Sequence, residues 1–163
     1  MAANVFCLID GVKGESSDKD FKEQIEVLSY SAGIHQPVSA TASSSGGGTT
    51  ERAEHRDITF EKEMDKTSPE LAKLCNEGKH IKSVVFSFNR AGGDGKRVLY
   101  YKVELENVVI SNININAASG VPKEEVSLNF GKIRWTYDQQ QRSGGGSGGK
   151  VVAGWDLEQW APW

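Results

Sequence analysis

Residues 65–80 read DKTSPELAKLCNEGKH, and they are the one stretch of this chain whose pattern predicts a helix. Ser68 can cap the free backbone N–H groups, Pro69 suits the first helical position, and Gly78 can end the helix in a left-handed conformation. The narrow apolar face of this helix consists of Leu71, Leu74 and Cys75. A single short helix among strands predicts a mainly β protein with one helical cover.

The part of the chain that precedes this helix has the pattern of strands. Residues 5–9 are apolar on both faces, so a strand there needs cover on each side. Residues 24–30 place Ile25 and Val27 on one face, with polar residues between them. Residues 58–64 alternate in the same way and predict a strand with one solvent-facing side that leads into the helix.

The part that follows the helix predicts a hairpin and long strands. The turn GGDG at residues 92–95 joins an alternating run around Phe86 to a strand over residues 99–115. The apolar residues of this strand keep one phase over much of its length: Leu99, Tyr101, Val103, Leu105, Val109, Ile113 and Ile115. Residues 151–157 predict the last strand.

Another strand contains a slip in its apolar pattern. Val126, Leu128 and Phe130 alternate regularly, and the next set, Ile133, Trp135 and Tyr137, is displaced by one residue. A bulge near Gly131 would return both sets to one face of the sheet.

About seven strands, one helix and no alternation of strands with helices predict a compact antiparallel β-barrel of two packed sheets with one short flanking α-helix. We expect a single domain over residues 1–163. Several strands are apolar on both faces, and one barrel interior cannot bury them all. Excess faces of this kind indicate a partner subunit, of which a second copy of the chain is the simplest.

Two polar segments predict loops. Residues 36–56 contain Pro37, many Ser, Thr and Ala residues, and three consecutive glycines, so we expect a long exposed loop. Residues 143–149 are mostly glycine and serine and predict a flexible loop before the last strand.

Composition excludes several classes of partner. The net charge is −3, the isoelectric point is near 5.7, and Lys and Arg form no cluster, so we expect neither nucleic acid nor an anionic membrane as a partner. The first ten residues, MAANVFCLID, have neither the basic start of a signal peptide nor the length of a membrane span. We therefore expect the protein to be made in the cytoplasm.

No set of residues predicts catalysis or a cofactor. His35, His55 and His80 are isolated from other ligands, which argues against zinc. Cys7 and Cys75 are expected to be two buried free thiols rather than a disulfide. At the C-terminus, we expect Trp155 to pack in the core, and Trp160 and Trp163 to belong to a tail that rests on the domain or on a neighbour. The alternative is a platform on which a sugar or base stacks.

Four segments of the chain resemble the Hcp family, the hemolysin-coregulated proteins of the bacterial type VI secretion system. They are FCLIDGVKGES with IEVLSYS (residues 6–16 and 25–31), ITF with DKTSPEL (58–60 and 65–71), SLNFGKI (127–133) and AGWD (153–156). Three positions depart from the family pattern: Phe21, where His is frequent, Ala32-Gly33, where Trp-Gly is frequent, and the terminal WAPW.

The resemblance implies a β-barrel similar to phage tail-tube proteins and a structural role without enzymatic activity. Hexameric rings would stack into a hollow tube, and the contractile sheath would expel the tube with its spike protein into target cells. The lumen of the ring would carry and stabilise small effector proteins. The protein would be made in the cytoplasm of a Gram-negative bacterium without a signal peptide, be secreted by this system, and lack a C-terminal effector extension.

The resemblance also assigns roles to single residues. Ser31 lies on the strand that resembles a lumen-lining one, so it is the candidate for contact with effectors. The candidates for contact between stacked rings lie in the long loop: Ser43, Gly46, Gly47, Gly48, Thr49 and Glu51. Two other functions stay open: a monomeric β-barrel that binds a small apolar ligand, and a secreted effector enzyme that uses Cys75 with His80.

Overall fold

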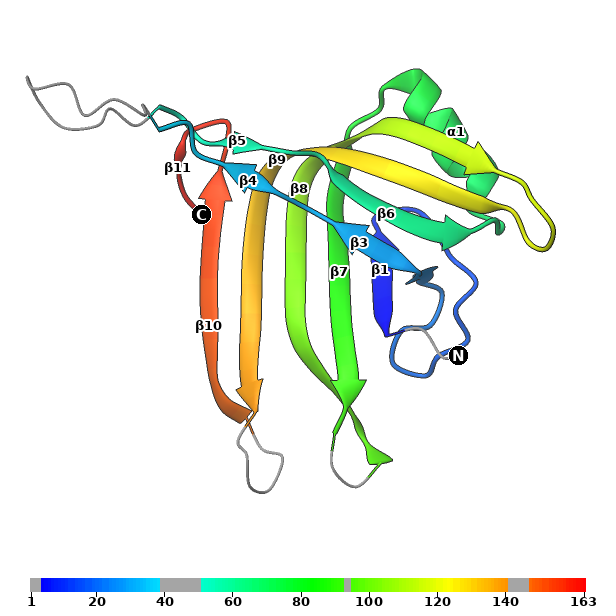
Figure 1. Ribbon diagram of the computed structural model, residues 1–163, viewed down its shortest axis with the longest axis horizontal. Coiled ribbons are helices and arrows are strands. Elements are labelled where there is room, and N and C mark those ends of the chain that lie inside the picture. The colour runs from blue at the N-terminus through cyan, green and yellow to red at the C-terminus, as the bar shows by residue number, and fades with distance from the viewer. Residues whose placement is uncertain (1–3, 39–50, 93–94, 141–146) are drawn as a thin grey trace, which may run out of the picture.

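The computed structural model describes residues 4–38, 51–92, 95–140 and 147–163 (Figure 1). One helix, α1, spans Ser68–Glu77. The strands are β1 (Val5–Ile9), β2 (Ile25–Val27), β3 (Ser29–Ser31), β4 (Ile34–His35), β5 (Glu54–His55), β6 (Ile58–Glu63), β7 (Ile81–Ala91), β8 (Arg97–Asn116), β9 (Lys123–Gln140), β10 (Ser147–Asp156) and β11 (Ala161–Pro162). The protein is therefore mainly β with one short helix, as the sequence predicts.

The strand pairings follow a closed path, and every pair is antiparallel. β1 pairs with β7, β7 with β8, β8 with β9, β9 with β6, and β6 with β3. β3 follows β2 after Leu28, whose N–H donates to the Glu61 carbonyl at 2.7 Å, and β2 pairs with β1. This path encloses the core as a barrel, and β10 and β11 extend the sheet beyond it from β9.

The core lies inside this path, and α1 covers one end of it. The largest fully buried apolar side chains of the core include Phe60, Phe86, Ile9, Ile25, Ile58, Leu71, Leu105, Ile110 and Leu128. α1 packs against β8 through Leu71, which is fully buried, with Leu74 and Cys75 partly buried beside it. The predicted helical cover is confirmed. Cys7 is a buried free thiol as predicted, whereas Cys75 is only half-buried, because it lies at the margin of the helix's contact with the sheet.

The predicted start of the helix is wrong in one detail. Thr67 is the N-cap residue, and no side chain caps the first turn. Ser68 is already helical, and its hydroxyl accepts the N–H of Asp65 at 3.0 Å, so it stabilises the preceding turn rather than the helix. The predicted end is confirmed: Gly78 has φ 58° and donates its N–H to the Cys75 carbonyl.

The two apolar sets of β9 do meet on one face at Gly131, but the predicted bulge is wrong, because β8 and β9 keep their register there and share the change of phase. Phe130 and Ile133 both face the core on either side of Gly131. On β8, Asn107 lies opposite and has φ 53°, so the buried set there changes from Val103 and Leu105 to Val108 and Ile110. The phase predicted over much of residues 99–115 thus holds up to Leu105, and Val108 and Ile110 take over the core-facing positions; the register between β8 and β9 shifts further on, between Ile110 and Asn112.

Both predicted loops contain strand at their ends. β4 pairs with β5, so residues 54–55 at the end of the predicted loop form a strand, and residues 39–50 of that loop lie outside the described part. β10 begins at Ser147, so residues 147–149 pair with β9 instead of belonging to the glycine-rich loop, and residues 143–146 lie outside the described part. Backbone pairing overrides the weak strand propensity of these glycines.

Candidate assembly surfaces

β4 and β5 form a projection that we call the arm, defined by the described residues 33–38 and 51–56 (Figure 1). The Arg56 N–H donates to the Gly33 carbonyl at 2.9 Å and closes its base. Of the predicted ring-contact residues, Glu51 is described and exposed. The others, Ser43, Gly46, Gly47, Gly48 and Thr49, lie outside the described residues. The exposed apolar side chains of Ile34 and Val38 make the arm a surface suited to contact with another molecule.

The base of the arm rests on aromatic side chains of β9. The His55 ring stacks on Trp135, with ring centroids 6.4 Å apart, and meets Phe130 edge-on at 6.1 Å. Burial in this position lowers the pKa of His55 below its ordinary value of 6.5, because the charged imidazolium loses hydration. Its stacked position against Trp135 and Phe130 therefore favours the neutral imidazole, which packs as an aromatic anchor for the arm.

β10 offers apolar side chains on both of its faces. Val151 is 67% exposed and Val152 is 55% exposed, and successive residues of a strand point to opposite sides. β11 pairs only with Trp155 and Asp156, so no described strand runs along the outer edge of residues 150–153. An edge strand with two apolar faces is a surface that a partner would cover.

An aromatic row continues the inner face of β10 across the sheet. Tyr101 on β8 lies opposite Tyr137 on β9, which lies opposite Val151 on β10, so the three side chains share one face. Tyr137 and Val151 are exposed, whereas Tyr101 packs against Phe88 with ring centroids 5.3 Å apart. Tyr137 lies on the predicted face of β9, in the half of the strand that extends past the barrel.

Ser31 lies in β3 and is exposed, in a row of hydroxyl groups. It is the register partner of Thr59 on β6, which is the partner of Ser127 on β9. The Thr59 and Ser127 hydroxyls are 2.9 Å apart and hydrogen-bonded. We call Ser31, Thr59 and Ser127 the hydroxyl row. Thr59 and Ser127 were not predicted as part of this site, although both alternate with buried apolar neighbours; Thr59 is half-buried and Ser127 is buried.

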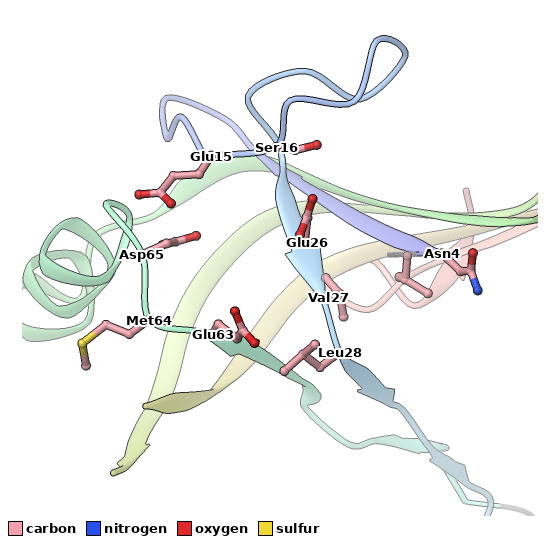
Figure 2. A pocket seen from close by; sticks show the side chains of 10 residues that line it. Asn4, Glu15, Ser16, Glu26, Val27, Leu28, Glu63, Met64 and Asp65 are labelled. Carbon is pink, nitrogen blue, oxygen red and sulfur yellow. The ribbon is translucent and has the colours of Figure 1, made fainter. Parts of the chain in front are cut away.

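An acidic hollow of about 490 Å³ lies where β1, β2 and β6 approach the start of α1 (Figure 2). Its carboxylates are Glu15, Glu26, Glu63 and Asp65, and its apolar side chains include Leu28 and Met64. Asp65 forms an ion pair with Lys62 at 3.0 Å. This lining does not suit a small apolar ligand, because carboxylates would lose hydration on binding it.

Cys75 and His80, the candidate catalytic residues, both make structural contacts. Cys75 is half-buried on α1, and His80 is hydrogen-bonded through Nδ1 to Asn107 Oδ1 at 2.6 Å. Burial raises the pKa of Cys7, so its thiolate is strongly disfavoured. Within the described ranges, no three His, Cys, Asp or Glu residues are grouped to hold a metal ion. No helix in the same part of the chain has the length and apolar character needed to cross a membrane.

Comparison with known proteins gives consistent matches over nearly the whole chain. The family model described as "Type VI secretion system effector, Hcp" matches residues 6–137. Protein hcp1 of Pseudomonas aeruginosa is 35% identical over 161 residues, which are 98% of each chain. Hcp1 from Salmonella typhimurium is 28% identical, with a TM-score of 0.82 and 100% of both chains covered. A further type six secretion system protein is 25% identical, with a TM-score of 0.89, covering 99% of this chain and 100% of the other.

These matches, together with the mainly β fold, define a protein of the type VI secretion system. The chain belongs to the Hcp family, as its sequence motifs predict.

Proposed function

We propose that this protein is a tube subunit of the type VI secretion system, in which six copies close into a ring and rings stack into a hollow tube. The tube is expelled with the spike protein by the contractile sheath. The ring lumen carries and stabilises small effector proteins. The role is structural, and the chain acts without catalysis or a cofactor.

The observation that carries this proposal is the uncovered apolar surface of β10 and the aromatic row beside it. A head-to-tail ring needs two different complementary surfaces on each subunit, and an edge strand that is apolar on both faces supplies one of them. We assign Val151, Val152 and Tyr137 to the contact between neighbouring subunits. Covering them would remove an apolar surface that the fold of the single subunit leaves exposed.

Two other surfaces receive roles in the same assembly. The arm, with Glu51 and the loop residues Ser43, Gly46, Gly47, Gly48 and Thr49, makes the contact between stacked rings. Ser31, the exposed end of the hydroxyl row, faces the lumen and contacts effectors, with the Thr59 and Ser127 pair behind it. Small uncharged hydroxyl groups fit this role because they bind varied protein surfaces by hydrogen bonds and impose no strong electrostatic preference.

Native mass spectrometry and negative-stain imaging of the purified chain test the proposal. We expect a hexameric species with a central opening, and Val151→Asp should weaken ring closure by about tenfold or more, since an unpaired charge would be buried at each contact. Val121→Asp is the matched control, because Val121 is 56% exposed at the turn between β8 and β9. A strictly monomeric protein at high concentration would falsify the proposal, and a co-purifying small ligand in that monomer would favour a binding module instead.

A further inference from the structure

The arm is held at a second place, where it meets the C-terminal end of the chain (Figure 1). The guanidinium carbon of Arg52 lies 5.2 Å from the ring centroid of Trp160, within the range of a cation–π contact. The Trp160 ring in turn meets Trp155 edge-on, with ring centroids 5.4 Å apart. Among the described residues, Arg52 has no ion pair, so the Trp160 ring is its one charge-stabilising neighbour there.

Trp160 reaches this position through a strained backbone. Its φ is 56°, a left-handed conformation that side chains other than glycine adopt at a cost. The turn is held by the buried carboxylate of Asp156, whose Oδ1 accepts the N–H groups of Glu158 at 2.9 Å and Gln159 at 3.0 Å. Such strain persists only where surrounding contacts maintain it. Here the hydrogen bonds of Asp156 hold the turn, and the turn places the Trp160 indole against the arm.

The remainder of the tail is fixed on the opposite face of the sheet. Trp155 shares the inner face with Ile133, its register partner, while Gly154 and Arg134 share the outer face. The Arg134 guanidinium lies 4.0 Å from the Trp163 ring centroid, and the Trp163 N–H donates to the Gly154 carbonyl at 3.1 Å. The tail thus folds around the end of β10, with Trp160 on the face that the arm crosses and Trp163 on the other.

We propose that residues 155–163 form a seat that fixes the direction of the arm through the contact between Trp160 and Arg52. The seat holds the arm in one pose before any partner binds, which lowers the ordering cost of a contact made by the arm. The part of this inference that concerns ring stacking rests on the proposed function. The part that concerns the arm's pose applies to a single subunit.

Hydrogen exchange of the backbone amides tests the seat in the single subunit. In Arg52→Ala and in Trp160→Ala we expect the Arg56 amide at the base of the arm to exchange about two- to fivefold faster. This factor corresponds to the free energy of one exposed cation–π contact. Arg52→Lys keeps a cation and should exchange at an intermediate rate. Glu54→Ala is the matched control, since Glu54 is an exposed acidic residue of the same arm outside the named ring-contact residues and should leave exchange unchanged.

Trp160→Gly separates the role of the indole from that of the turn. Glycine adopts φ 56° without strain, so this variant keeps the turn and removes only the ring. Faster exchange of the arm in Trp160→Gly supports the seat. Wild-type exchange in both Trp160→Gly and Arg52→Ala, or an equal effect of Glu54→Ala, overturns it.

Imaging of assemblies then tests the consequence for stacking. Arg52→Ala should form hexameric rings as abundantly as the wild type, while stacks of rings become shorter at the same protein concentration. Rings that stack to wild-type length in spite of a freed arm overturn the stacking part. If the wild type forms no rings, the proposed function fails, and the exchange data still decide whether the seat exists.

Discussion

The two halves of β9 differ in what covers them, although they belong to one continuous strand. The first half of β9 pairs along one edge with residues 58–63 of β6 and along the other edge with β8. This half is therefore part of the closed barrel. From Lys132 onward, β10 replaces β6 as the neighbour. Gly131 lies between these two partners, and the phase of the buried side chains changes there. In the first half Val126, Leu128 and Phe130 are buried, while beyond Ile133 every residue is half-buried or exposed.

This difference separates the parts of the chain that fold the subunit from those that we assign to assembly. The first half contributes side chains to the core and one member of a buried ion pair. The second half carries the aromatic row, the outer strand β10, the support for the arm and the C-terminal seat. Changes in the first half should therefore lower the stability of the subunit, and changes in the second half should alter the arm and the contacts with partners.

The largest effect is expected from breaking the buried ion pair of the first half. Lys62 on β6 and Glu124 on β9 are 1% and 2% exposed, and their charged groups are 2.7 Å apart. Lys62→Ala leaves Glu124 buried without its cation, so the free energy of unfolding should fall by about 3–5 kcal/mol. Urea denaturation followed by tryptophan fluorescence measures this change.

Two companion variants make this result interpretable. Lys73→Ala removes a lysine from the exposed pair with Glu77 on α1 and should cost less than about 0.5 kcal/mol. The double variant Lys62→Met with Glu124→Leu replaces both charges by apolar groups and should recover most of the lost stability. Equal effects of Lys62→Ala and Lys73→Ala would show that the buried pair does not hold β6 to β9.

A smaller effect is expected from Gly154→Ala in the second half. An added Cβ would overlap the backbone carbonyl of Trp163 and lie 3.1 Å from that of Ile133. The tail is the element that can move away, so we expect a loss of about 1–3 kcal/mol, with release of β11 and no change in the barrel. Hydrogen exchange should show faster exchange of the Trp163 amide, and removal of residues 161–163 should abolish most of the cost of the substitution. If Gly154→Ala lowers the stability equally in the chain without residues 161–163, the overlap with the Ile133 carbonyl causes the loss instead.

Much of the fold was predictable because it depends on local patterns. A continuous apolar run identified β1, the alternation of apolar residues identified β2, β6 and β7, and Gly78 marked the end of α1. The joint phase change at Asn107 and Gly131 was only half predicted. A glycine in a strand is a visible signal, whereas Asn107 in a left-handed conformation is specified by its partner strand and by its hydrogen bonds to His80 and Glu158.

The assembly surfaces were less predictable because they depend on which faces stay uncovered. The excess of apolar strand faces was visible in the sequence, but its place on β10 and Tyr137 required the pairing of β9 with two different neighbours. Lys62 has an apolar position in its strand, and nothing local shows that Glu124, far away in the chain, neutralises it. The contact of Arg52 with Trp160 likewise joins segments that no periodicity relates.

The smallest expected effect is a pH dependence of the arm through His55. We call the arm closed when His55 packs on β9 and released when it does not. Burial against Trp135 and Phe130 lowers the pKa of His55 below 6.5, so the closed arm favours the neutral imidazole. Above pH 6.5 the ring is neutral whether the arm is closed or released, and its contribution to closure is complete. As the pH falls from there through the lowered pKa, the released arm binds the proton first, and closure weakens. Exchange of the Arg56 amide, corrected for the intrinsic pH dependence of exchange, should therefore quicken between pH 7.5 and pH 5 in the wild type. The faster exchange at low pH should persist in His35→Gln, which removes the exposed imidazole of the same arm. It should disappear in His55→Gln. If it persists in His55→Gln, another group causes the pH dependence and His55 is not the acid-sensitive anchor of the arm.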